Sequence, residues 1–319
     1  MKTIKLYFLI LAFSLCGCVS SESFKEQTSP YIPATTVQTE PTASTVETSL
    51  PASEATLPTT GQITPPTVLV RPEPDDEDFV NVKTYIPDII VELPYSTANN
   101  FTKEKIYDFS DAWLRYGTVK KLIQVHDELK QSGLSLKIWD GFRPPSAQFK
   151  LWEICPDPTY VSNPNNGYSS HSRGNTVDIT LVYADGTELA MPTGFDDFSK
   201  LADRDYSDCS KEAATNAIFL EELMKKCGFK PYSGEWWHFT DTRSYPVDQS
   251  FEPTESVMYY ANCNEYISLR VKPSPSSDAI TQILVGETFH VVAHCGDFAL
   301  IEYNGLTGYV LQKYILPAI

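Results

Sequence analysis

The stretch GYSSHSRGNTVDITL, residues 167–181, decides how the rest of this chain is interpreted. It places His171 seven positions before Asp178, with mostly small and polar residues between them. From residue 176 onward polar and apolar residues alternate, which predicts a β-strand with one buried face. A histidine and an aspartate beside a strand can bind a metal ion. This spacing alone is weak evidence, because a buried histidine is more often held by hydrogen bonds alone.

A second stretch supplies a further histidine. GEWWHFT, residues 234–240, contains Glu235 and His238. Zinc sites that catalyse hydrolysis use three protein ligands and leave a fourth position for water. His171, Asp178 and His238 together would form such a set of ligands.

The same stretches hold groups that could act on water and on a substrate carbonyl. Glu235 is a natural general base for the water and a later acid for the leaving amine. In a regular strand Glu235 and His238 would face opposite sides, so we expect Glu235 to lie in the turn before the strand. In WDGFRPPSA, residues 139–147, Arg143 can stabilise the oxyanion that forms when water attacks.

The surrounding sequence predicts helices and strands mixed along the chain. Apolar residues at helical spacing predict a helix over residues 119–129, and a serine cap with a closing glycine predicts another over 210–227. On the second helix the residues expected on one face are Ala214, Ala217, Ile218 and Met224. The other expected elements are strands at 134–138 and 176–182, a helix at 146–154 and a hairpin turn at 184–187. We therefore expect an α+β domain over residues 79–250, with an antiparallel sheet and flanking helices.

The C-terminal part has a different pattern. We expect a break at residues 251–255, followed over residues 262–319 by short strands separated by Pro-Ser, Val-Gly-Glu, Cys-Gly-Asp and Asn-Gly turns. This pattern predicts a small all-β barrel. Five cysteines lie beyond the first 18 residues, and an odd number leaves at least one free. A disulfide between Cys263 and Cys295 is one pairing that the sequence leaves open.

The beginning of the chain differs in composition. Residues 1–18 combine a short basic region with an apolar run too short to span a bilayer, and they end in Leu-Cys-Gly-Cys. This predicts a lipoprotein signal peptide with Cys18 as the lipidated residue; the alternative is an ordinary secretory signal. Residues 19–78 are rich in Ser, Thr, Pro and Glu, so we expect a disordered tether. The net charge of −16 argues against a nucleic-acid partner.

Several of these stretches resemble one family of enzymes. SSHSRGNTVD is similar to the S-x-H-x-x-G-x-x-D signature of zinc D,D-peptidases, and EWWHF is similar to their E-x-W-H signature. YSTANNFT (residues 95–102), WDGFRP (139–144) and SSHSRG (169–174) resemble, in the same order, landmarks of the VanX-like D-alanyl-D-alanine dipeptidases. The resemblance covers roughly residues 82–242. Thr176 is a small departure, since the family usually has Ala there.

The resemblance implies a set of roles for individual residues. It implies one zinc ion per chain on His171, Asp178 and His238, with Glu235 as the base and Arg143 as the group that stabilises the transition state. It also implies three residues that line the dipeptide site, which are Tyr95, Ser169 and Asp196. Asp196 would bind the free amine, and Asp197 is its rival, because the loop before it cannot be aligned without a gap.

The C-terminal barrel resembles a second family. Residues 269–271 and 308–310 match the marks of bacterial SH3 domains, which often bind cell-wall peptides and otherwise serve as spacers. We therefore expect an enzyme outside the cytoplasm, anchored to the cell membrane by lipid, that cleaves free D-Ala-D-Ala or a related dipeptide. One alternative is a D,D-carboxypeptidase that trims peptidoglycan stem peptides. Another is an inactive wall-binding lipoprotein. The best-known members of the dipeptidase family are cytoplasmic single domains, so the signal peptide and the barrel are departures.

Overall fold

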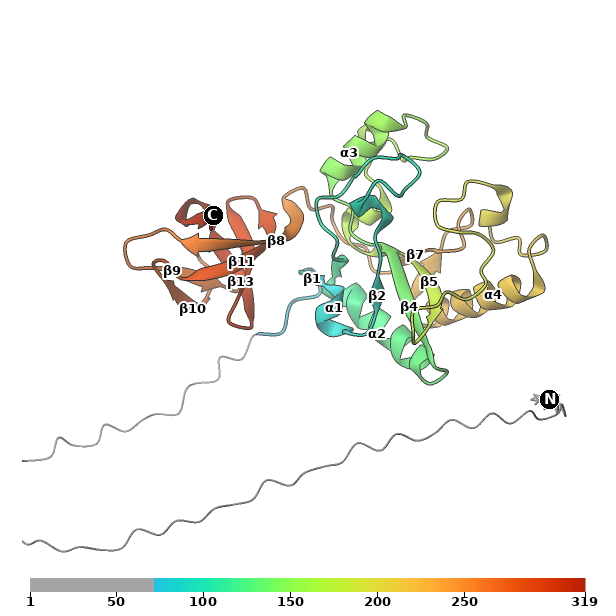
Figure 1. The fold of residues 1–319 in the computed structure, drawn as a ribbon, viewed down its shortest axis with the longest axis horizontal. Coiled ribbons are helices and arrows are strands. Elements are labelled where there is room, and N and C mark those ends of the chain that lie inside the picture. The colour runs from blue at the N-terminus through green and yellow to red at the C-terminus, as the bar shows by residue number, and fades with distance from the viewer. Residues whose placement is uncertain (1–71, 319) are drawn as a thin grey trace, which may run out of the picture. The chain divides into compact units, whose positions relative to one another are not determined.

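A computed structural model describes residues 72–318 of the chain (Figure 1). The predicted signal peptide, Cys18 and most of the predicted tether lie outside the described residues. Residues 72–78, the end of that predicted tether, belong to the fold: Arg243 forms ion pairs with Asp76 and Glu77, and Lys272 forms ion pairs with Asp75 and Asp78. No helix within the described part of the chain combines the length and the apolar character needed to cross a bilayer.

A five-stranded sheet forms the centre of the first domain. Its strand order is β2 (Ile90–Val91), β4 (Leu134–Asp140), β5 (Thr176–Tyr183), β7 (His238–Asp241) and β6 (Phe229–Pro231). Strands β4, β5, β7 and β6 pair antiparallel, as predicted, whereas the short β2 runs parallel to β4. The predicted turn at 184–187 is present and is closed by a single bridge between Val182 and Glu188. The α+β class predicted from the sequence is confirmed.

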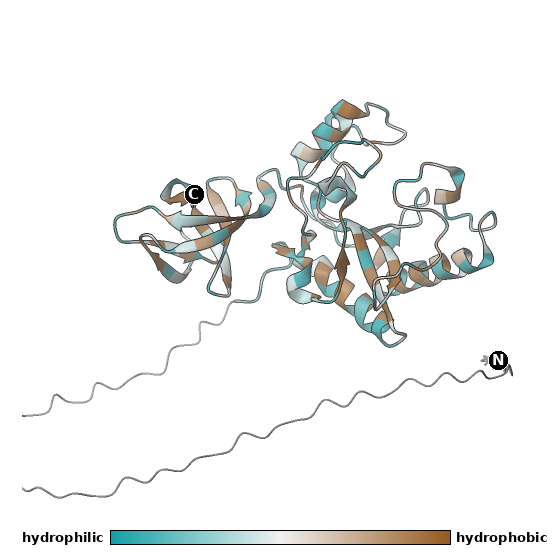
Figure 2. Cartoon of the chain, in the orientation of Figure 1, coloured by the Kyte–Doolittle hydropathy of each residue, from teal (hydrophilic) through white to brown (hydrophobic). Residues whose placement is uncertain are grey.

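Two of the helices described in this domain pack against the sheet, and the other two lie on neighbouring elements. The helices are α1 (Val82–Tyr85), α2 (Tyr116–Lys130), α3 (Pro145–Ile154) and α4 (Lys211–Lys226), and Figure 1 shows α2 and α4 alongside the strands. In Figure 2 the central strands are largely hydrophobic, whereas the helices carry both colours. The Ser210 side chain accepts a hydrogen bond from the Ala213 amide and so caps α4, as its sequence predicts.

The buried face of α4 differs from the predicted one. The side chains of Ala213, Ala217, Leu220 and Met224 are buried, whereas Ile218 is 44% exposed. The prediction for Ile218 is therefore wrong, although the helix itself is where the sequence places it. Two neighbouring stripes of this helix are both partly apolar, and contact with the sheet selects the one that contains Leu220.

Shorter elements complete the first domain. Strand β1 (Phe79–Asn81) pairs antiparallel with β3 (Trp113–Arg115). Single turns of 3₁₀ helix occur at η1 (Pro94–Ser96), η2 (Pro164–Asn166), η3 (Ser170–Arg173) and η4 (Lys200–Ala202).

The C-terminal region is a seven-stranded antiparallel sheet around its own apolar core. Its strand order is β10 (Ala279–Leu284), β9 (Tyr266–Arg270), β13 (Leu306–Leu311), β12 (Phe298–Tyr303), β11 (Thr288–Cys295), β8 (Phe251–Ala261) and β14 (Ile315–Pro317); the one-turn helix η5 (Gln312–Tyr314) precedes β14. Strand β8 runs through the predicted break at 251–255. Cys263 and Cys295 are both free thiols, so the disulfide considered from the sequence is not formed.

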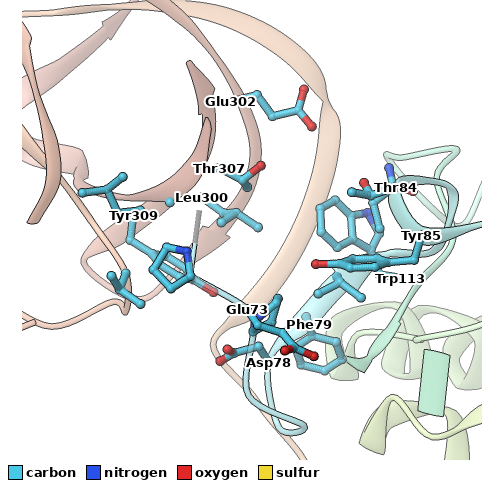
Figure 3. A pocket seen from close by; sticks show the side chains of 17 residues that line it. Glu73, Asp78, Phe79, Thr84, Tyr85, Trp113, Leu300, Glu302, Thr307 and Tyr309 are labelled. Atoms are coloured by element: carbon cyan, nitrogen blue, oxygen red, sulfur yellow. The ribbon is translucent and has the colours of Figure 1, made fainter. Parts of the chain in front are cut away.

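A cavity lies at the aromatic residues of β1, β3 and α1. Figure 3 shows Phe79, Tyr85 and Trp113 in its wall, together with Glu302 and Tyr309 from β12 and β13. None of the residues predicted to bind metal or substrate lines this cavity. The candidate active site is therefore elsewhere, on the central sheet.

Candidate functional site

Two strands and one helical turn bring the predicted metal ligands together. Asp178 on β5 and His238 on β7 are directly opposite partners in the antiparallel register, so their side chains leave the same face of the sheet. His171 lies in η3, which ends at Gly174 in a left-handed conformation (φ 74°). An added Cβ at Gly174 would also lie 2.3 Å from the Phe79 ring, so both conformation and space require glycine here.

The donor atoms of these residues lie close enough together to bind one metal ion. Nε2 of His171 lies 3.4 Å from Nδ1 of His238 and 3.3 Å from Oδ2 of Asp178, and Nδ1 of His238 lies 3.0 Å from Oδ1 of Asp178. Zinc bonds of about 2.0–2.1 Å at tetrahedral angles put neighbouring ligand atoms roughly 3.3–3.4 Å apart. The three residues therefore converge on one point at distances that suit a bound cation, although the two contacts of Asp178 involve different oxygens.

Two further observations fit a cation at this position. Asp178 is 3% exposed, and its Oδ1 accepts no hydrogen bond from any described residue. A buried carboxylate oxygen normally has a partner, and a metal ion would supply one. The Nδ1–H of His171 donates to the Gly141 carbonyl at 2.8 Å, which directs the lone pair of Nε2 toward Asp178.

The carboxylates and imidazoles of the site shift each other's pKa values. Burial alone would raise the pKa of Asp178, but the imidazoles of His171 and His238 lower it far below its usual value. Burial would likewise lower the pKa of His171, and the carboxylates of Asp178 and Asp140 raise it instead. Asp178 is thus held as an anion, the form in which a carboxylate binds metal.

Glu235 lies beside the metal ligands but does not belong to their set. It occupies the turn before β7, as predicted, and its Oε2 is 3.4 Å from Nδ1 of His238. Burial and the nearby charge of Asp178 raise its pKa. A carboxylate with a raised pKa close to a hydrolytic site has the property that a general base needs.

Arg143 follows β4 and is held by buried groups. Its Nη2 donates to Oδ2 of Asp140 at 2.6 Å, and its Nη1 donates to Oε1 of Gln148 at 3.1 Å. Burial would lower the pKa of Arg143, but Asp140 raises it well above its ordinary value, so the group is always cationic. The guanidinium carbon lies 5.2 Å from the ring centre of Tyr95.

Tyr95 contacts both Arg143 and the carboxylate of Asp196. The hydroxyl of Tyr95, which is 3% exposed, donates to Oδ2 of Asp196 at 2.8 Å. Burial raises the pKa of Asp196 to about 7, and the charge of Asp178 adds to this effect. Asp196 has φ 54°, whereas its rival Asp197 accepts a hydrogen bond from the Ser199 amide in an exposed turn.

Ser169 has a local structural contact. Its side chain is 8% exposed, and its Oγ accepts a hydrogen bond from the His171 amide at 3.3 Å. It therefore caps the turn that carries a metal ligand. A role for Ser169 in binding the dipeptide stays a prediction.

The sequence interpretation missed three residues around Arg143. Asp140 lies three positions before it in the same WDGFRPPSA stretch, so a carboxylate at that spacing was a usable signal. Tyr107 donates to Oδ1 of Asp140 at 2.7 Å, and Gln148 lies on α3. Nothing in the sequence near Tyr107 or Gln148 connects them with Arg143.

Comparisons with known proteins agree with this geometry. Residues 75–256 match the family model described as D-ala-D-ala dipeptidase, in peptidase family M15, and residues 265–315 match the bacterial SH3 domain model. A D-alanyl-D-alanine dipeptidase of Escherichia coli (strain K12) is 35% identical over 175 residues, which covers 54% of this chain and 90% of the relative. The enzyme of the same name from Streptomyces coelicolor is 32% identical over 187 residues, covering 51% and 91%. That of Enterococcus faecium is 30% identical over 180 residues, covering 50% and 89%.

Proposed function

Since the chain belongs to the D-Ala-D-Ala dipeptidase family of metallopeptidases, we propose that it hydrolyses D-alanyl-D-alanine, or a related cell-wall dipeptide, with one zinc ion per chain. The observation that carries the proposal is the set of donor separations of 3.0–3.4 Å among His171, Asp178 and His238. These ligands leave the fourth position of a tetrahedral site free for water.

Each remaining group of the site has a distinct task in this reaction. A zinc ion on the three ligands would lower the pKa of a water molecule and polarise the scissile carbonyl. Glu235 takes a proton from the attacking water and returns it to the nitrogen of the leaving D-alanine. Arg143 donates to the carbonyl oxygen as negative charge develops on it.

We expect Arg143→Ala to lower kcat by about 10²–10³-fold, with a much smaller change in KM, because the guanidinium interacts mainly with charge that forms in the transition state. Arg143→Lys is expected to recover only part of this loss, since lysine lacks the planar fork. Steady-state kinetics on the dipeptide measure both constants. A sharp rise in KM at unchanged kcat would instead assign Arg143 to the substrate carboxylate.

The position of Asp196 favours a free dipeptide over a longer peptide. Its carboxylate accepts a hydrogen bond from Tyr95, and the Tyr95 ring lies 5.2 Å from the guanidinium carbon of Arg143, so Asp196 and the group assigned to the oxyanion contact the same side chain. A free α-ammonium can form an ion pair with this carboxylate, whereas an acylated nitrogen cannot. A D,D-carboxypeptidase, which acts on acylated substrates, has no use for such a group.

We expect Asp196→Asn to raise KM for D-Ala-D-Ala by roughly 10–100-fold, the value of a hydrogen bond to a charged group. The pH dependence should reveal the same residue. Asp196 must be ionised to bind the ammonium, and because its pKa is raised to about 7, KM of the parent should rise as the pH falls below 7. The free amine loses its charge above about pH 8, so KM should rise there too. In Asp196→Asn the rise on the acid side should vanish; if it persists, another group titrates.

A release assay on three substrates tests the proposal. D-Alanine would be measured from D-Ala-D-Ala, from its N-acetyl derivative and from a stem pentapeptide, each with and without a chelator. The proposed dipeptidase cleaves only the first, and only without chelator. Cleavage of the pentapeptide and of the N-acetyl compound would support the D,D-carboxypeptidase instead, and failure on all three would support an inactive wall-binding protein.

We also propose that the enzyme works outside the cytoplasm on a lipid anchor at Cys18, with the barrel of residues 265–315 as the module that binds cell wall. The sequence of residues 1–18 and the similarity of the barrel to bacterial SH3 domains support this. Labelling of cells with radioactive palmitate tests the anchor, since Cys18→Ala should abolish the label. Sedimentation of the full chain with purified peptidoglycan, compared with an unrelated acidic protein, tests the wall binding.

A further inference from the structure

The guanidinium of Arg143 is accounted for donor by donor. An arginine side chain has five N–H groups. Nε and one Nη2 hydrogen are directed to Oδ2 of Asp140, at 3.2 and 2.6 Å, and one Nη1 hydrogen is directed to Oε1 of Gln148, at 3.1 Å. The hydroxyl of Tyr107 also lies 3.3 Å from Nε. Within residues 72–318, one hydrogen on each terminal nitrogen has no hydrogen-bond partner and is available to a substrate.

Asp140 alone would hold this group only at one point. Both of its bonds to Arg143 end on the same oxygen, Oδ2, so the guanidinium could turn about that atom. The carboxylate itself is fixed, because its Oδ1 accepts from the Tyr107 hydroxyl at 2.7 Å and from the Gly141 amide at 2.9 Å. Asp140 therefore fixes the position of the guanidinium at one atom but does not fix its orientation.

Gln148 supplies the second point of attachment. Its side chain is fully buried on α3, and both ends of its amide are used: Oε1 accepts from Arg143, and Nε2 donates to the Ser162 carbonyl at 2.7 Å. Glutamate would lose the donor to Ser162 and place a second negative charge beside the guanidinium. The site thus requires a neutral side chain with one acceptor and one donor, which is glutamine at this length.

We propose that Gln148 is a positioning residue for catalysis: it stops the guanidinium of Arg143 from turning about Asp140 and so aims the two remaining N–H groups at the carbonyl oxygen of the substrate. This inference rests on the proposed role of Arg143 in the transition state. A displacement of about 1 Å in a catalytic group can cost as much as 10²-fold in rate. The hydrogen bond from Arg143 to Gln148 would prevent such a displacement.

The kinetic test removes the amide while keeping the length of the side chain. Gln148→Met is expected to lower kcat on D-Ala-D-Ala by about tenfold or more, a part of the 10²–10³-fold assigned to the whole oxyanion donor, with KM within about twofold. Gln124→Met, an exposed glutamine on α2, is the matched control and should change neither constant. If methionine prevents folding, as judged by thermal unfolding, Gln148→Asn keeps an amide that is too short and should show the same loss.

A double-mutant cycle separates positioning from general packing. If Gln148 acts through Arg143, then Gln148→Met should cause no further loss of kcat in an Arg143→Ala background. An equal factor in both backgrounds would overturn the proposal and make Gln148 a structural residue.

A second readout does not depend on turnover. In nitrogen-15 NMR spectra of the parent, the Nη hydrogens of Arg143 should give separate, slowly exchanging signals, because the group is held at two points. In Gln148→Met these signals should merge, and unchanged signals would overturn the proposal. A parent that cleaves no D,D-peptide would refute the proposed function, while the NMR comparison would still decide whether Gln148 fixes Arg143.

Discussion

Glu235→Ala is expected to keep its zinc and to lose at least about 10²–10⁴-fold in kcat, the range associated with a general acid–base group. Glu235 lies 3.4 Å from His238, but the proposed ligands are His171, Asp178 and His238 and do not include it. Its removal should therefore leave the metal in place while the attacking water and the leaving amine lose their proton carrier. Kinetics and metal analysis on the same sample measure both effects.

Two variants control this experiment. Glu235→Gln keeps the shape of the side chain and cannot accept the proton, so it should be as inactive as Glu235→Ala. Glu222→Ala removes an exposed carboxylate from α4 and should have no effect. Loss of zinc from Glu235→Ala would instead make Glu235 a ligand, and the roles in the site would have to be redrawn.

His238→Ala is expected to lose both bound zinc and activity. His238 supplies one of three protein ligands, and its register partner Asp178 would then remain as a buried carboxylate beside a single histidine. Two ligands do not make a hydrolytic zinc site. Metal content by mass spectrometry and D-alanine release should fall together, to the limit of detection.

The control for His238→Ala is His290→Ala, which replaces an exposed histidine on β11 that contacts Ser256. This variant should keep zinc and full activity. If His238→Ala bound zinc as tightly as the parent, the ligand set proposed here would be wrong.

The sequence was enough to nominate His171, Asp178 and His238 as metal ligands because two stretches together resemble the signatures of one enzyme family, and the folded chain brings the three side chains together. The sequence could not supply the register that joins them. Asp178 and His238 pair across strands β5 and β7, and η4, α4 and β6 lie between these strands along the chain. Their register is therefore visible only in the folded sheet. The choice between Asp196 and Asp197 was likewise open, because the loop before them could not be aligned without a gap, and only in the folded chain does Asp196 accept a hydrogen bond from Tyr95.

Elements with an ambiguous local pattern were harder to predict. The buried face of α4 could not be predicted from its sequence, since Ile218 lies on an apolar stripe next to the one that contacts the sheet. Strand β8 resembled a linker because it contains Pro253 and two glutamates. Pro253 is accommodated because it pairs with Ala293 where the register of β11 shifts, a position at which a strand tolerates proline. Gln148 was not recognised in the sequence, although it lies only five positions after Arg143, because no motif marks the hydrogen bond that the first turns of α3 bring about.

The most direct measurement of the central claim is D-alanine release from D-Ala-D-Ala as zinc is added back to metal-free protein, with bound zinc determined on the same samples. We expect no release without metal and a linear rise that ends at one zinc ion per chain. Full release of D-alanine from metal-free protein would contradict this expectation. So would the same zinc-dependent rise in His238→Ala, because the activity would then not depend on zinc bound at His171, Asp178 and His238.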